Sequence, residues 1–184
     1  MQMTPAKMPD LILVRGAPGS GKSQTAKALS RHFPKGVRME VDTLRSMVIS
    51  VDWINQSEHI GVLALSAQTA CDFLRLGFCP VIVVDTFSGG KLDGFLETIH
   101  EQGLSPVVSI FGLYASKEEL GRRLQTRGPE EFTDTDISFR LNEEVLSSAY
   151  TGECQINTTE LTSDETVAAM LQCMSMKHLS DTSI

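Results

Sequence analysis

The residues from Gly16 to Ser23 read GAPGSGKS, and this octet constrains the chain more than any other feature of the sequence. It matches the pattern G-x-x-x-x-G-K-S/T, which ordinary residue usage produces by chance in roughly one chain of this length in two hundred. An apolar run, DLILVR, precedes it, and a helical pattern follows it. A phosphate-binding loop between a strand and a helix requires this context. The alternative is a glycine-rich turn with a solvated lysine.

Each residue type in the octet suits the binding of a nucleotide. Glycines at positions 16, 19 and 21 permit unusual backbone conformations and let amide groups approach an anion closely. Successive N–H groups and the positive end of the following helix can then bind phosphates. Lys22 can reach the β- and γ-phosphates, while the Ser23 hydroxyl can ligate Mg²⁺. We therefore expect ATP and Mg²⁺ as cofactors, with these nucleotide-binding residues: Gly16, Ala17, Pro18, Gly19, Ser20, Gly21, Lys22, Ser23 and Gln24.

Apolar, β-branched runs alternate with amphipathic segments along almost the whole chain. The pattern predicts strands at 10–15, 37–41, 80–85, 106–113 and 153–157. It predicts helices at 23–33, 57–76, 92–102, 116–126, 135–149 and 163–176, followed by a loose tail. This alternation indicates a three-layer α/β fold, with a five-stranded, mainly parallel sheet, helices on both faces and a small helical lid. We expect one domain over 1–184, with its core at about 10–176.

The chain is acidic, with 23 Asp and Glu against 16 Lys and Arg and a net charge of −7. Proteins that bind nucleic acid over a broad surface are normally basic, because neutralised phosphates supply most of their affinity. The charge therefore favours a small-molecule partner, although it leaves nucleic acid possible.

The four cysteines form no CxxC pair and no zinc-ligand spacing with the four histidines. This predicts free, buried or half-buried thiols in a reducing compartment. The first ten residues lack the apolar core of a signal peptide. No apolar run approaches the roughly 20 residues that span a bilayer. We expect a cytoplasmic protein with no membrane partner.

Two aspartates follow predicted strands, and we expect them beside the phosphate loop because parallel strands end at one edge of the sheet. Asp42 could accept the proton of an attacking hydroxyl, or it could merely cap a helix. Arg45, three residues on, could hold a substrate anion. Asp85 suits a Mg²⁺-binding role, and the alternative is a surface aspartate at a strand exit. Thr86 follows it as a candidate substrate contact.

Three arginines, Arg122, Arg123 and Arg127, precede the helix-breaking pair Gly128-Pro129. Arg123 and Arg127 are four residues apart, so they would share one face of a helix. Two such cations in a lid could stabilise the negative charge of a transferring phosphoryl group. The alternative is a solvated basic helix end that interacts favourably with the helix dipole.

Together these motifs resemble the P-loop kinase group that includes AAA-type kinases, polynucleotide 5′-hydroxyl kinases, zeta toxins, chloramphenicol phosphotransferase, and gluconate and shikimate kinases. The motifs that carry the resemblance are Gly16–Ser23, the D-x-x-R of Asp42–Arg45, the strand Val81–Thr86 that ends in DT, and the R-x-x-x-R-G of Arg123–Gly128. The resemblance implies that Asp42 is the general base and Arg45 a substrate-binding residue. It also implies that Arg123 and Arg127 are lid residues on ATP, and that the segment 157–165 borders the adenine.

The function implied is ATP-dependent transfer of the γ-phosphoryl group to a hydroxyl of a small molecule. One alternative is a polynucleotide 5′-hydroxyl kinase or a nucleotide-sugar kinase of the zeta-toxin type. The other is a non-catalytic, regulatory nucleotide-binding module. The segment Phe87–Lys91 reads FSGGK where relatives often continue with Asn and a later basic residue, which supports this last alternative. Lys91 is a candidate replacement for the missing cation.

Overall fold

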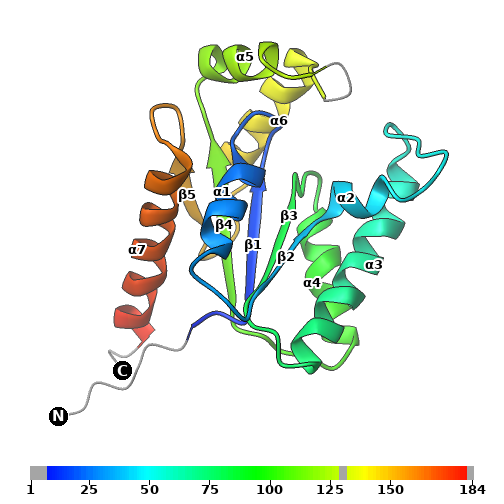
Figure 1. The fold of residues 1–184 in the computed structure, drawn as a ribbon, viewed down its shortest axis with the longest axis vertical. Coiled ribbons are helices and arrows are strands. Elements are labelled where there is room, and N and C mark those ends of the chain that lie inside the picture. The colour runs from blue at the N-terminus through cyan, green and yellow to red at the C-terminus, as the bar shows by residue number, and fades with distance from the viewer. Residues whose placement is uncertain (1–7, 129–131, 182–184) are drawn as a thin grey trace.

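Five strands form one sheet in the order β2-β3-β1-β4-β5, and every neighbouring pair is parallel. The computed structural model describes residues 8–128 and 132–181. The strands are β1 Leu11–Gly16, β2 Val37–Glu40, β3 Val81–Asp85, β4 Val108–Tyr114 and β5 Cys154–Asn157. Figure 1 shows the twisted sheet at the centre of the molecule. The predicted fold class and the place of all five strands are confirmed.

The helices are α1 Lys22–Ser30, α2 Val41–Arg45, α3 Gln56–Arg75, α4 Lys91–Glu101, α5 Lys117–Gln125, α6 Thr135–Ser147 and α7 Ser163–Asp181. Helix α7 continues five residues past the predicted end at Met176, so the expected loose tail is wrong up to Asp181; residues 182–184 lie outside the described ranges. The extension contains no Gly or Pro that would stop a helix. Within the described ranges, none of the helices combines the length and apolar character needed to cross a membrane.

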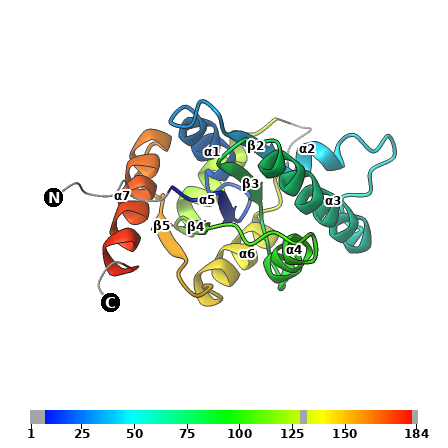
Figure 2. The ribbon, with the colours of Figure 1, turned by 90° about the horizontal axis from the view of Figure 1, so that it is seen from below.

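Helices cover both faces of the sheet and create a three-layer structure. On one face, Leu11 and Leu13 of β1 pack in a cluster with residues of α3 and α4. On the other face, Ile12 and Val14 pack in a cluster with residues of α1 and α7. Figure 2 shows these two helical layers on opposite sides of the strands. Because Leu11–Val14 of β1 are buried on one face or the other, this part of the strand is a continuous apolar run.

The register of the parallel strands brings the candidate site together at one edge of the sheet. Arg15 of β1 pairs with Asp85 of β3, and Glu40 of β2 pairs with Val84. The chain therefore leaves β1, β2 and β3 at nearly the same height. This places the phosphate loop, the start of α2 and Asp85 beside one another.

A disulfide joins Cys154 of β5 to Cys173 of α7, with a Cα–Cα distance of 6.6 Å. The prediction of free thiols is therefore wrong for these two cysteines. The two residues are 19 positions apart, and only the packing of α7 beside β5 brings them together. Cys71 and Cys79 are free, the first buried and the second exposed.

Candidate active site

The segment between β1 and α1 has the backbone of a phosphate-binding loop. A Cβ atom at Gly16 would lie 2.3 Å from Ser20 Oγ and 2.6 Å from the carbonyl oxygen of Leu113, so only glycine fits there. Gly19 and Gly21 have φ values of 87° and 90°, which favour glycine. Gly21 caps α1 without any side-chain hydrogen bond. The amides of the first turn are therefore available to an anion.

Lys22 lies at the start of α1, with its Nζ 3.4 Å from the carbonyl oxygen of Ala17. Burial lowers the pKa of Lys22, and the positive charge of Arg127 lowers it further. The charges of Asp42 and Asp85 act in the opposite direction without reversing the shift. The ammonium group is thus partly stripped of water in a site where nucleotide phosphates would restore favourable electrostatic contacts.

Asp42 occupies the first turn of α2, but its carboxylate makes no hydrogen bond among the described residues. The N-cap of α2 is Glu40, so the alternative in which Asp42 caps this helix is wrong. Burial raises the pKa of Asp42, and the charge of Asp85 raises it further. Lys22 is the strongest of the charges that oppose this shift. The residue keeps an exposed side, so a ligand can reach the carboxylate.

Asp85 is buried and already has two protein partners. Its Oδ1 lies 3.1 Å from Nε2 of His59, and its Oδ2 accepts a hydrogen bond of 2.9 Å from the backbone N–H of Phe87. Burial on its own would raise the pKa of Asp85, but the hydrogen bond and charge of His59, with the Phe87 amide and Lys22, hold it below the ordinary value. The alternative of a surface-facing aspartate is therefore wrong, because Asp85 is only 4% exposed.

Sequence reasoning missed His59. The residue lies in the first turns of α3, on the face that buries Leu63, Ser66, Ala67 and Ala70. The sequence signal for its burial was the spacing of four residues between His59 and Leu63, which puts both on one face of the helix. Its partner could not be read from the sequence, because Asp85 is 26 residues away and on a different element.

The donors near the loop fit a Mg²⁺ ion whose other ligands are phosphate oxygens and water. Ser23 is exposed, and its hydroxyl makes no hydrogen bond with any of the described residues. The Asp85 oxygens each keep further acceptor capacity beside the bonds to His59 and Phe87. Across 8–128 and 132–181, no cluster of three His, Cys, Asp or Glu residues could hold a metal by itself. This set suits Mg²⁺, which binds few protein ligands and keeps several waters.

Arg45 is buried, and one nitrogen of its guanidinium group, Nη2, makes the polar contacts with the protein. It donates to the backbone carbonyl of Asp52 at 2.9 Å, pairs with Glu58 at 3.5 Å, and lies 4.8 Å from the ring centroid of Trp53. Arg45 therefore holds the segment between α2 and α3 in place. Its Nε is buried and has no hydrogen-bond partner among the described residues.

The turn after β3 carries Thr86, which is half-buried, and then Lys91 at the start of α4. The Nζ of Lys91 lies 2.9 Å from Oε1 of Gln56 and 3.4 Å from Oγ of Ser88. Both partners are neutral. The turn is an ordered connection whose last glycine, Gly90, is the N-cap of α4.

The arginines of the predicted lid separate into different environments. Arg123 donates to the carbonyl oxygens of Thr158 and Gly19, at 2.6 and 3.2 Å, and also bonds Glu119. Arg122 is exposed, and among the residues that the structure describes it bonds Glu119. Arg127 lies beyond the end of α5, so it does not share a helical face with Arg123 as predicted; its guanidinium group donates to the carbonyl oxygen of Phe132 at 2.9 Å. Arg127 is the one whose charge acts on Lys22.

A cavity of about 490 Å³ lies next to the phosphate loop, between the starts of α1 and α7 and the exposed side of α5. Gly21 and Gln24 line it from α1, Arg123 lines it from α5, and residues 158–163 line it from the segment after β5. Thr158, in the segment 157–165 that we expected to border the adenine, donates from its hydroxyl to the carbonyl oxygen of Ser20 at 2.9 Å. The expected adenine-bordering segment thus lies directly beside the phosphate loop.

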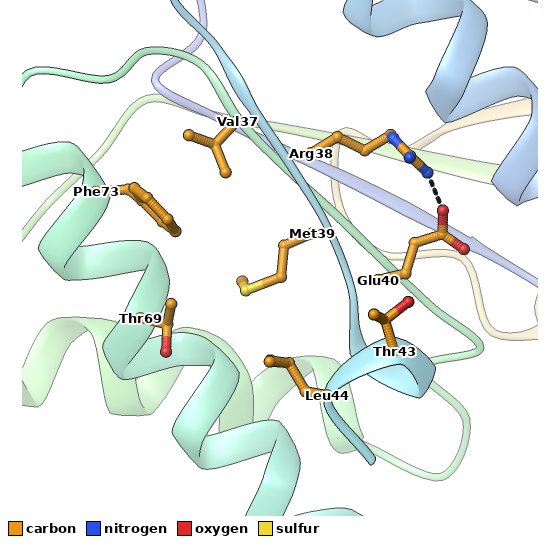
Figure 3. A pocket seen from close by; sticks show the side chains of 8 residues that line it. All are labelled: Val37, Arg38, Met39, Glu40, Thr43, Leu44, Thr69 and Phe73. Carbon is orange, nitrogen blue, oxygen red and sulfur yellow. Dashed lines mark hydrogen bonds and ion pairs between the residues drawn. The ribbon is translucent and has the colours of Figure 1, made fainter. Parts of the chain in front are cut away.

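A second cavity, of about 330 Å³, lies on the flank of the sheet between β2, α2 and α3. Figure 3 shows Val37, Met39 and Phe73 pointing into it, while Arg38 and Glu40 pair at the side. This cavity is apolar in its centre and does not include any residue of the phosphate loop. Of these two cavities, only the first adjoins the phosphate loop.

A parallel sheet with a phosphate loop after β1, a lysine in that loop and two strand-end carboxylates defines a P-loop fold of the kinase type. The chain belongs to the AAA domain family, whose model matches residues 12–145. No sequence of a curated protein matches the chain.

Solved structures share the fold at low sequence identity. A gluconokinase from Sinorhizobium meliloti 1021 superposes with a TM-score of 0.67 at 17% identity, over 97% of this chain and 99% of that one. The tunicamycin resistance protein of Deinococcus radiodurans gives 0.66 at 21% identity, over 90% and 96%. A shikimate kinase from Acinetobacter baumannii gives 0.63 at 13% identity, over 97% of each chain. The resemblance to P-loop kinases is confirmed at the level of fold and family.

Proposed function

We propose that this protein transfers the γ-phosphoryl group of ATP to a hydroxyl group of a small molecule, with Mg²⁺ as cofactor. The observation that carries the proposal is the proximity of the Asp42 carboxylate to Lys22. Asp42 is a carboxylate with no hydrogen-bond partner among the described residues, and it is close enough to the lysine of the phosphate loop for each to shift the pKa of the other. A reachable carboxylate at this point favours a kinase over a nucleotide-binding module without catalysis.

In the proposed mechanism, the loop amides and Lys22 bind the β- and γ-phosphates of ATP. The raised pKa of Asp42 makes it a better proton acceptor than an ordinary aspartate. Asp42 accepts the proton of the acceptor hydroxyl as its oxygen attacks the γ-phosphorus. The bond between the γ-phosphorus and the oxygen that bridges it to the β-phosphorus breaks, and ADP leaves. The products are ADP and a phosphomonoester.

Three further groups support transfer. Mg²⁺, held through Ser23 and near Asp85, would neutralise charge on the phosphate oxygens. Arg127 extends from the α5–α6 connection and acts on Lys22, so it is the arginine that can face the γ-phosphoryl group. Arg123 instead holds the loop after β5 against the phosphate loop, where the adenine would bind.

A small acceptor is supported by the net charge of −7 and by the fold shared with a gluconokinase and a shikimate kinase. The proposal can be tested by incubating the protein with MgATP and two acceptor sets, small hydroxyl compounds and oligonucleotides with a free 5′-hydroxyl. Mass spectrometry of the products then reports which set gains a phosphoryl group. We expect a phosphomonoester from the small set.

Lys22→Ala serves as the inactive control, because the lysine binds the phosphates that are transferred. If only the oligonucleotides gained a phosphoryl group, the acceptor would be a polynucleotide and not a small molecule. Thermal stabilisation by ATP without any phosphorylated product from either set would contradict a kinase and favour a regulatory nucleotide-binding module.

A further inference from the structure

The Cys154–Cys173 disulfide closes a covalent ring that includes one wall of the cavity beside the phosphate loop. Cys154 begins β5, Cys173 lies in α7, and the chain between them turns through residues 158–162. That turn, with Ser163 and Thr166 of α7, lines the cavity of about 490 Å³. Figure 1 shows the chain turning after β5 and returning beside the sheet as α7. The bond therefore joins the two elements between which this wall extends.

Hydrogen bonds fix the two ends of the wall, one to the sheet and one to α7. At the first end, the buried Thr158 donates from its N–H to the carbonyl oxygen of Tyr114 at 2.8 Å and from its hydroxyl to that of Ser20 at 2.9 Å. At the second end, the N–H of Thr162 donates at 2.8 Å to Glu165, in the first turn of α7. The placement of α7 against the sheet therefore sets the shape of the wall.

Apolar packing and the disulfide together hold α7 against the sheet. Val167, Met170 and Met174 of α7 lie in one buried cluster with Ile156 of β5. Such packing is not directional, so it restrains a small shift of the helix less than a covalent bond does. A disulfide that restrains a loop in its binding conformation raises affinity, because less freedom is lost when the ligand binds.

The disulfide is also the one bond that a reductant would break. Cys154 and Cys173 are both half-buried, and a thiolate has to reach one of the two sulfurs to open the bond. The other two cysteines, Cys71 in α3 and Cys79 before β3, are already free and line neither cavity. A redox change therefore acts on the wall and not elsewhere in the protein.

We infer that this disulfide is a redox switch on nucleotide affinity, with ATP bound more tightly when the bond is formed. In the reducing step, a dithiol gives up two electrons and two protons and becomes a disulfide. The Cys154–Cys173 bond breaks, and each of its sulfurs becomes a thiol. The reduced wall must then be ordered when ATP binds, and this cost lowers the affinity. The inference rests on the proposed function, because it concerns the regulation of that nucleotide site.

The test compares two ligands with the full chain, before and after reduction by dithiothreitol. Isothermal titration calorimetry with Mg²⁺ measures the affinity for a non-hydrolysable ATP analogue and for tripolyphosphate, which has no nucleoside to contact the wall. We expect reduction to weaken binding of the analogue about fivefold to tenfold and to leave that of tripolyphosphate nearly unchanged. Equal affinity for the analogue in both states overturns the inference. Equal weakening of both ligands also overturns it, since that reports a loss of the whole fold.

Cys173→Ser removes the bond without a reductant. This variant should bind the ATP analogue as weakly as reduced wild type does, and dithiothreitol should not change its affinity. The matched control is Cys79→Ser, which removes an exposed free thiol and keeps the disulfide, so it should respond to dithiothreitol as wild type does. A response in Cys173→Ser, or none in Cys79→Ser, contradicts the inference.

The coupling has to act in the opposite direction as well. In a buffer of dithiol and disulfide, a saturating ATP analogue should shift the equilibrium toward the Cys154–Cys173 bond by the same factor by which the affinities differ. Counting thiols in quenched samples measures this shift, and its absence contradicts the switch.

Phosphoryl transfer is measured separately, so that the two proposals can fail independently. Redox-dependent affinity without transfer to any acceptor supports the switch and counts against the proposed reaction. Transfer with equal ATP affinity in the oxidised and reduced protein supports the reaction and overturns the switch.

Discussion

At the scale of single residues, the candidate site combines a lysine and two aspartates whose pKa values the fold shifts in different directions. Burial lowers the pKa of Lys22 and raises that of Asp42, whereas His59 keeps the pKa of Asp85 below its ordinary value. Asp85 is thus satisfied by the protein, and Asp42 is not. The two carboxylates therefore differ in environment, because only Asp85 has hydrogen-bond partners among the described residues.

Asp42→Asn should keep or raise the stability of the protein. Since burial raises the folded-state pKa of Asp42 above its ordinary value of 3.8, the folded protein holds this proton more tightly than the unfolded chain does. The resulting stabilisation is present at acidic pH and is lost as the pH rises through the folded-state pKa. An amide cannot ionise, so urea denaturation at neutral pH should give a midpoint at or above that of wild type. A clearly lower midpoint would contradict this account of Asp42.

His59→Leu should destabilise the protein by about 3 kcal/mol, because it leaves a buried carboxylate with one partner fewer. The lowered pKa of Asp85 means that its contribution is present above the unfolded-state value of 3.8 and is lost as the pH falls through the folded-state pKa. Urea denaturation over a pH series should therefore show the loss in the variant mainly at neutral pH.

His59→Gln is the matched variant, since its amide can still donate to Asp85. It should recover a large part of the stability. If both variants behaved alike, the hydrogen bond between His59 and Asp85 would not be what stabilises this part of the molecule.

At the scale of elements, two sets of hydrogen bonds hold the segment after β5 against the phosphate loop. Arg123 of α5 contacts both Gly19 and Thr158, and the Thr158 hydroxyl reaches Ser20. These hydrogen bonds join the phosphate loop, α5 and the segment after β5, which together line the cavity in which we propose that the nucleotide binds. The role predicted for Arg123, direct contact with the transferring phosphoryl group, stays a prediction beside this structural one.

Arg123→Ala should weaken ATP binding by about tenfold, because it removes hydrogen bonds that fix the walls of the nucleotide cavity. Isothermal titration calorimetry with a non-hydrolysable ATP analogue measures the change. Arg75→Ala is the control, since Arg75 also bonds a carboxylate and a backbone carbonyl but lies at the end of α3 away from the cavity. An equal affinity for both variants would show that Arg123 does not shape the nucleotide site.

The disulfide between β5 and α7 predicts a definite count of reactive thiols. A thiol reagent should detect one group in the native protein, Cys79, and two in the denatured, unreduced protein, because Cys71 is buried and free. Reduction should raise the count to four and lower the stability by about 3 kcal/mol, given a separation of 19 residues. Four thiols before reduction would contradict the pairing of Cys154 with Cys173.

The elements differ in how far the sequence predicts them. β1 and β3 are buried on both faces, so their continuous apolar runs identify them and their ends place the phosphate loop and Asp85. The short helix α2 starts directly after β2, and no sequence signal separates the two. The Cys154–Cys173 pairing and the contacts of His59 and Thr158 arise only when elements distant in sequence pack together.

At the scale of the whole molecule, the fold brings a nucleotide cavity and a reachable base to one side of the sheet. The phosphate loop and the strand-end aspartates could be predicted because parallel strands share an edge. The different environments of Arg123 and Arg127 could not be predicted, because they depend on where α5 ends. The central claim is that Asp42 activates a hydroxyl for attack on ATP bound at Lys22.

The most direct test of that claim is the rate of phosphoryl transfer from ATP to a hydroxyl acceptor in wild type and in Asp42→Asn, measured at saturating MgATP. We predict that the variant binds the ATP analogue as tightly as wild type but transfers the phosphoryl group roughly a hundredfold more slowly or worse. Transfer at the same rate in both proteins would contradict the claim.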